Sequence, residues 1–117
     1  MRVPEQYVTP DSFVVRVDGE SMEPTLSNGD LVICEWHRTP RQNGQVVIMA
    51  AFEAGGEGGD FALKRFEDSE THWLFHSDNP EEPDPPPLPK FDQPGHPILG
   101  IARYNLTKSE TIPAKHR

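Results

Sequence analysis

Short runs of β-branched and aromatic residues, separated by turns that contain glycine or proline, constrain the fold of this chain more than any other feature. Such runs are typical of strands, and no long window carries the period of about 3.6 residues that marks an amphipathic helix. The predicted strands lie at residues 13–17, 31–36, 45–52, 61–66, 72–76 and 98–104. The sequence therefore predicts an all-β fold, with at most a turn or two of helix around residues 22–26.

The pattern within these runs predicts which side chains form the core. Phe13, Val15 and Val17 share one face of the first strand, whereas residues 45–52 are apolar almost throughout and are expected to be buried on both faces. The single cysteine, Cys34, cannot form an internal disulfide. We expect it to be a small buried hydrophobic residue of a protein from a reducing compartment.

The 117 residues are predicted to form a single domain, since this length suffices for one modest hydrophobic core. The core is expected at about residues 13–104, after an N-terminal arm at residues 1–12 and before a polar tail at residues 105–117. Residues 80–97 contain eight prolines, which predict an extended connection without regular structure.

The composition argues against two classes of partner. A net charge of −8 disfavours binding to a phosphate backbone, because nucleic-acid-binding surfaces are basic. No apolar stretch reaches the roughly 18 residues that span a bilayer, and the N-terminus does not resemble a signal peptide. We therefore expect a soluble, cytoplasmic protein that binds neither nucleic acid nor a membrane.

Ser21 lies in the most distinctive turn of the sequence. It comes two residues after Gly19, close to the end of a predicted strand, and backbone N–H groups at such a turn are able to bind an oxyanion. A serine at this position is also an ordinary turn residue. As a nucleophile it would need a base, and the spacing of the five histidines neither favours nor excludes a Ser-His-Asp triad.

Lys64 is a second candidate for the base. It lies within a strand with Ala62 and Phe66 on its own face, where lysine is uncommon. Its side chain either extends to solvent or is buried as a neutral amine. The second state requires its pKa to fall by about three units, which costs roughly 4 kcal/mol and is typical of a functional site.

Two other segments have ordinary explanations. The glycine-rich residues 54–60 lack the Gly-Lys-Ser/Thr pattern of a phosphate-binding loop and are predicted to form a lengthened hairpin. The acidic residues 78–84 lack a calcium-loop pattern, so a solvated connection is favoured over a calcium site. The proline run is interpreted as a rigid crossover, with a docking segment as the alternative. No metal or cofactor is predicted.

Five blocks of the sequence resemble, in the same order, blocks of the LexA/UmuD-type Ser–Lys peptidases. The blocks are residues 17–32 (VDGESMEPTLSNGDLV), 43–48 (NGQVVI), 62–66 (ALKRF), 76–81 (HSDNPE) and 98–102 (ILGIA). The resemblance implies a LexA-like fold of small curled antiparallel sheets. It also implies Ser21 as the nucleophile, Lys64 as the general base, and the backbone N–H groups of Glu20 and Ser21 as the oxyanion hole.

Signal peptidases, which are membrane-anchored relatives, use the same dyad. They tend to carry a hydroxyl where this chain has Gly19, and no transmembrane segment is found here, so the LexA-like branch fits better. The chain also departs from the LexA-like repressors. About a dozen residues precede the first strand, too few for a helix-turn-helix domain, and the Ala54-Gly55 bond that resembles a self-cleavage site follows Ser21 instead of preceding it.

The resemblance thus supports the fold and the dyad better than self-cleavage. We expect a bacterial serine endopeptidase that cleaves a polypeptide partner or a regulatory segment, as in an SOS or other stress response, and that forms a homodimer. The alternatives are a non-catalytic dimerisation or partner-binding module with the same fold, and the severed peptidase domain of a repressor.

Overall fold

The computed structural model describes residues 3–36, 43–50, 61–90 and 98–114, and these residues form the predicted all-β fold. A single short 3-10 helix, η1, precedes the strands in this part of the chain. The elements are η1 (Glu5–Tyr7), β1 (Ser12–Arg16), β2 (Leu31–Trp36), β3 (Val46–Ala50), β4 (Phe61–Asp68), β5 (His72–His76), β6 (Leu88–Pro89), β7 (Ile98–Asn105) and β8 (Glu110–Thr111).

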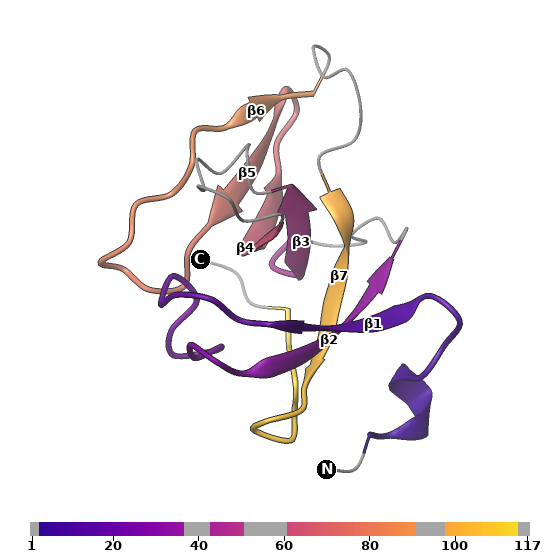
Figure 1. The fold of residues 1–117 in the computed structure, drawn as a ribbon. Helices are drawn as coiled ribbons and strands as arrows, with labels where there is room; N and C mark the ends of the chain where they lie inside the picture. The colour runs from indigo at the N-terminus through magenta and orange to yellow at the C-terminus, as the bar shows by residue number, and fades with distance from the viewer. Residues whose placement is uncertain (1–2, 37–42, 51–60, 91–97, 115–117) are drawn as a thin grey trace.

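The strands form one antiparallel sheet in the order β1-β2-β7-β3-β4-β5-β6, with β8 paired to β7. Figure 1 shows β7 running between the β1–β2 pair and the strands β3 to β6. Gly100 on β7 pairs with both Trp36 and Ile48, and a Cβ at Gly100 would lie 2.1 Å from the carbonyl oxygen of Glu35. The close approach of β2 to β7 therefore requires glycine at this position.

The six predicted strands are observed, and the bounds of β2 and β5 agree with the prediction residue for residue. The end of the predicted strand 45–52 and the predicted hairpin 54–60 lie outside the described residues. Around residues 22–26 the chain forms hydrogen-bonded turns, with Leu26 N–H donating to the Met22 carbonyl at 2.9 Å.

Two short strands lie in segments where the sequence predicted none. The proline-rich connection contains β6, which pairs with β5, and the polar tail contains β8, which pairs with β7. Proline is compatible with β6 because this strand lies at the edge of the sheet, where one side of the backbone needs no partner.

The core consists of two main clusters on opposite faces of β3. Val46 and Ile48 pack in the first cluster, and Val47 and Met49 pack in the second, which confirms that this strand is buried on both faces. The other buried members of the first cluster are Val17, Met22, Leu26, Val32, Cys34 and Ala102. Those of the second are Phe66, Phe75 and Ile98. Cys34 is buried, as predicted.

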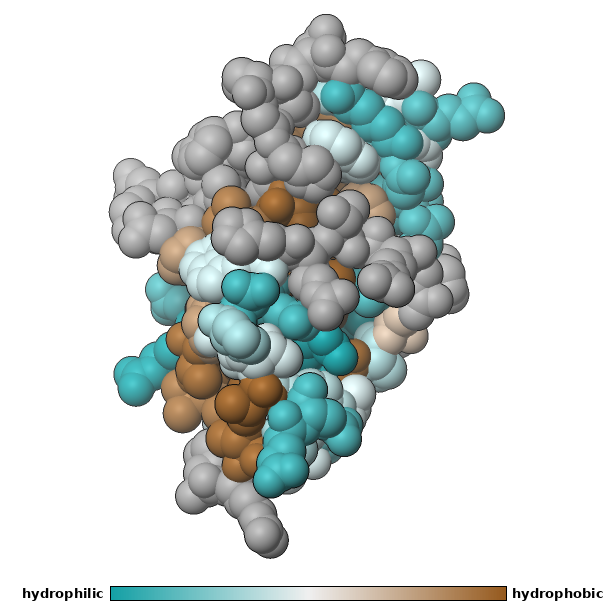
Figure 2. Space-filling model, turned by 90° about the vertical axis from the view of Figure 1, so that its right-hand side faces the viewer, coloured by the Kyte–Doolittle hydropathy of each residue, from teal (hydrophilic) through white to brown (hydrophobic). Residues whose placement is uncertain are grey.

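Apolar residues are also found on the surface, where Figure 2 shows them gathered in patches on one face of the molecule. The large hydrophobic side chains that are exposed in the described residues are Val3, Val8, Val14 and Phe61. None of the helices in the described ranges has the length and the apolar character needed to cross a membrane.

Candidate active site

The turn that carries Ser21 lies between β1 and β2 and is anchored on the core. Met22 and Leu26, which follow the serine, are buried in the first cluster, whereas Ser21 itself is half-buried. Gly19 has a φ of +98°, and its N–H donates to Asn28 Oδ1 at 2.8 Å. This backbone conformation is one that side chains rarely adopt, so it accounts for a glycine two residues before the serine.

Lys64 is buried in β4, with 9% of its surface exposed, so the alternative in which its side chain extends to solvent does not hold. Burial lowers the pKa of the Lys64 ammonium because desolvation penalises the charged form, while the carboxylates of Asp84 and Glu82 act in the opposite direction. Lys64 Nζ donates a hydrogen bond to Ser77 Oγ at 3.1 Å. Relative to the charged ammonium, the neutral Lys64 amine is therefore more stable in the protein than it is in water.

Three consecutive residues after β5, beginning with Ser77, connect Lys64 to the Ser21 turn. Ser77 accepts the hydrogen bond from Lys64. Two residues later, the backbone N–H of Asn79 donates to the Ser21 carbonyl oxygen at 2.9 Å, and Asn79 Nδ2 donates to the Glu20 carbonyl oxygen at 3.0 Å. One short segment thus sets the position of the serine turn relative to the lysine.

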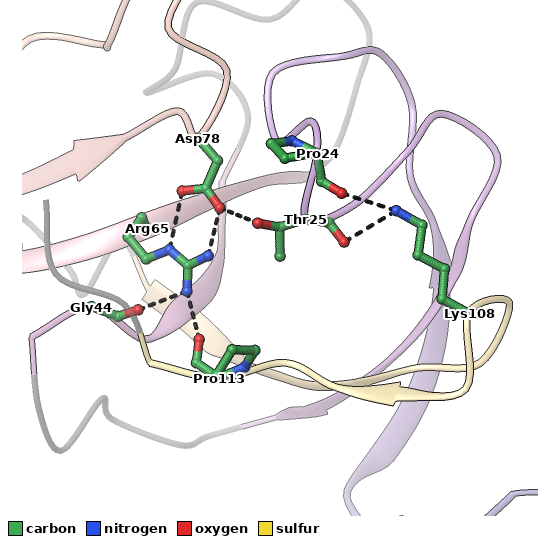
Figure 3. Close-up of polar contacts among 7 residues, drawn as sticks. All are labelled: Pro24, Thr25, Gly44, Arg65, Asp78, Lys108 and Pro113. Carbon is green, nitrogen blue, oxygen red and sulfur yellow. Dashed lines mark hydrogen bonds and ion pairs between the residues drawn. The ribbon is translucent and has the colours of Figure 1, made fainter.

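The middle residue of that segment, Asp78, belongs to a buried ion pair (Figure 3). Arg65 Nε donates to Asp78 Oδ1 at 3.1 Å, and Arg65 Nη2 donates to Asp78 Oδ2, which also accepts from Thr25 Oγ1 at 2.6 Å. Arg65 Nη1 donates to the carbonyl oxygens of Gly44 at 2.9 Å and Pro113 at 2.7 Å. Through Thr25, the ion pair therefore joins β4, which carries Lys64, to the part of the turn that follows Ser21.

The C-terminal part of the chain holds the end of the same turn. Lys108 Nζ donates to the Pro24 carbonyl oxygen at 3.0 Å and lies 3.7 Å from Asp30 Oδ2 (Figure 3 shows the first contact). Asn105 Nδ2 donates to the same Asp30 oxygen at 2.8 Å. Residues that were predicted to form a polar tail thus help to fix the candidate site.

The predicted site residues are not all joined by direct contacts. No hydrogen bond links Ser21 Oγ to Lys64 Nζ in the described part of the chain, so their action as a dyad stays a prediction. Within the same ranges, the backbone N–H groups of Glu20 and Ser21 donate to no backbone acceptor, and their role as an oxyanion hole stays a prediction. The Ala54-Gly55 bond lies outside the described residues.

Two histidines are described, and neither is hydrogen-bonded to Ser21. His72 Nδ1 lies 2.7 Å from Thr71 Oγ1, and His76 lies between two carboxylates. The other three histidines are outside the described residues. No group of histidine, cysteine, aspartate and glutamate side chains suited to a metal ion is found in the described ranges.

Sequence reasoning did not assign roles to Ser77, Asp78 or Arg65. A signal for Ser77 lies in the pairing of β4 with β5. Arg65 pairs with His76 in this antiparallel register, so the preceding residue on β4, Lys64, lies opposite the following residue, Ser77. The Arg65–Asp78 pair had no comparable signal, since it depends on where the segment after β5 folds back.

The buried lysine amine and the serine-bearing turn are thus linked by one short segment of an all-β fold. In a comparison with family models, the model described as Peptidase S24-like matches residues 1–102. The chain therefore belongs to the Peptidase S24-like family, which confirms the predicted resemblance to the LexA/UmuD-type peptidases. A search of the curated proteins finds no match.

Proposed function

We propose that this chain is a serine endopeptidase in which Ser21 is the nucleophile and Lys64 the general base. The observation that carries the proposal is the buried Lys64 amine, whose hydrogen-bond partner Ser77 belongs to the segment that also holds the Ser21 carbonyl. Membership of the Peptidase S24-like family supports the same reaction class.

In the proposed reaction Ser21 Oγ attacks the carbonyl carbon of a peptide bond and gives its proton to the neutral Lys64 Nζ. The backbone N–H groups of Glu20 and Ser21 stabilise the oxyanion. The C–N bond then breaks as Lys64 returns the proton to the leaving amine, and a water molecule hydrolyses the acyl-enzyme by the same steps. Ser77 orients the amine through its hydrogen bond.

The proposed substrate is an extended polypeptide segment of a partner protein, cleaved in the cytoplasm by a homodimer. A non-catalytic module with the same fold is the competing proposal, and the lack of a direct Ser21–Lys64 hydrogen bond in the described structure is the observation that favours it. A Ser–Lys site whose bonds are long in the free protein remains competent when contacts tighten on substrate binding.

A fluorophosphonate probe separates the two proposals because it reacts with an activated serine and needs no known substrate. We expect labelling at Ser21, located by mass spectrometry, at a rate that rises with pH through an apparent pKa below that of free lysine. Lys64→Arg is expected to be unlabelled, since guanidinium cannot act as a base at working pH. His72→Gln serves as the matched control and should label like the wild type.

Two results would contradict the peptidase proposal. Folded wild-type protein that stays unlabelled across the pH range would favour the non-catalytic module. Labelling of Lys64→Arg at the wild-type rate would show that Lys64 is not the base, even if Ser21 is the nucleophile.

A further inference from the structure

Lys108, in the segment between β7 and β8, contacts the end of the Ser21 turn. Its Nζ donates to the carbonyl oxygens of Pro24 at 3.0 Å and Thr25 at 3.5 Å (Figure 3), and it lies 3.7 Å from Asp30 Oδ2. A lysine side chain has three N–H donors, which matches these three oxygens. Basic side chains that donate to the last carbonyl oxygens of a helical turn stabilise its end. Lys108 therefore fixes the turn shortly after the serine.

The neighbours of Lys108 hold it in place, and we refer to residues 105–108 as the clip. The Lys108 backbone N–H donates to Asn105 Oδ1 at 3.0 Å, and Asn105 Nδ2 donates to Asp30 Oδ2 at 2.8 Å. Burial alone would raise the pKa of Asp30, but its hydrogen bonds, first that from Asn105, and the charge of Lys108 lower it overall. The Asp30 carboxylate thus joins the clip to the turn at a second point.

Different parts of the chain hold the start and the end of the turn. Asn79 bonds to the carbonyl oxygens at the start, and Asp78 accepts from Thr25 Oγ1 in the middle. The clip binds the carbonyl oxygens at the end. The family model matches residues 1–102, so the clip lies beyond the matched range. Its hold on the turn is therefore a feature of this chain that the family match does not predict.

We propose that Lys108 is a positioning residue for Ser21: by holding the end of the turn, it keeps the serine hydroxyl where it reacts. This inference rests on the proposed role of Ser21 as the nucleophile. The serine and the carbonyl oxygens that Lys108 binds belong to one short turn, so a shift of one moves the other. A displacement of about 1 Å at a reacting group can cost roughly a hundredfold in rate. Because Asn79 and Asp78 still hold the rest of the turn, the loss expected without Lys108 is smaller.

The rate at which the fluorophosphonate probe labels Ser21 tests the position of the hydroxyl. Lys108→Met keeps an unbranched side chain without N–H donors, and we expect it to lower the rate about tenfold. Lys108→Arg keeps N–H donors at the end of a long side chain and should recover most of the rate. Lys90→Met is the matched control, because it changes the net charge equally but removes a contact with Asp68 at the end of β4. It should label like the wild type.

Amide hydrogen exchange, measured by NMR, reports on the turn without any chemical reaction of the serine. The Ser27 N–H donates to Asp30 Oδ2 at 2.9 Å, and the Leu26 N–H is hydrogen-bonded within the turn. In Lys108→Met both amides should exchange about tenfold faster, because the end of the turn opens more often. The Phe66 N–H of β4, which is also hydrogen-bonded, should exchange as in the wild type. This comparison separates release of the turn from a general loss of stability.

The two measurements together decide the proposal. Unchanged exchange of the turn amides in Lys108→Met would overturn it, because the clip would not hold the turn. Faster exchange with an unchanged labelling rate would overturn it too, as would an equal loss of labelling in Lys90→Met, which would assign the effect to net charge. If the wild type itself does not label, the proposed function fails and the positioning of Ser21 fails with it, whereas the exchange rates still decide whether Lys108 holds the turn.

Discussion

Asp78→Ala is expected to destabilise the protein strongly, because it removes one partner of a buried ion pair. The Arg65 and Asp78 side chains are 1% and 5% exposed, so the guanidinium would stay buried with its charge uncompensated. Loss of one partner of such a pair typically costs about 3–5 kcal/mol. Arg65 keeps its bonds to the Gly44 and Pro113 carbonyl oxygens, which places the expected loss near the lower limit, about 3 kcal/mol.

Urea unfolding, followed by tryptophan fluorescence, measures this loss as a change in the free energy of unfolding. Glu70→Gln, at an exposed position, is the control and should change it by less than about 0.5 kcal/mol. The double variant Arg65→Met/Asp78→Leu should be more stable than Asp78→Ala alone, since no buried charge is left unpaired. A loss below about 1 kcal/mol in Asp78→Ala would refute the reasoning, because it would mean that water replaces the carboxylate at little cost.

Three further predictions concern other parts of the molecule. Gly100→Ala should lower the free energy of unfolding by about 1–3 kcal/mol or more, because its Cβ would lie 2.1 Å from the Glu35 carbonyl oxygen; an unchanged urea midpoint would contradict this. Burial raises the pKa of the Cys34 thiol to about 12, so a thiol reagent should label Cys34 only in unfolded protein, and rapid labelling of the native state would count against its burial. Folding lowers the pKa of Lys64, so between this lowered pKa and the ordinary lysine value the unfolded state binds more protons than the native state. The free energy of unfolding should therefore rise with pH over this range. Lys64→Met should lack this rise, and parallel pH profiles of the two proteins would show that the pKa of Lys64 is not lowered by folding.

The strands were predictable because their side-chain pattern records burial directly. The apolar run of β3 and the alternation in β1 have the same form in the sequence as in the structure. The strands β6 and β8 were not predictable, because each consists of only two residues, too few to show an alternating pattern, and pairs with a neighbour only once the sheet exists. Their pairing is a property of the backbone and its position, and no side-chain pattern encodes it.

The candidate site likewise contains residues that could be predicted from the sequence and residues that could not. Ser21 and Lys64 could be found from the sequence because each is unusual in its local setting, a serine in a glycine-containing turn and a lysine within a strand. Of the residues that hold them, Ser77 follows from the pairing of β4 with β5, whereas the roles of Asp78 and Asn79 depend on the path of the chain after β5. A family resemblance marks that segment, but it does not say which atom contacts which.

Lys64 and Arg65 are adjacent basic residues on β4, and the fold gives them different environments. Successive side chains of a strand point to opposite faces, so the two residues meet different partners. Arg65, which cannot lose its proton, is buried against a carboxylate, whereas Lys64, which can, is buried against a hydroxyl. Lys64→Arg should therefore be less stable than Lys64→Met, since it buries a second permanent cation with Ser77 as its hydrogen-bond partner. If the two variants unfold at the same urea concentration, the environment of residue 64 tolerates a charge, and the argument that it selects a neutral amine fails.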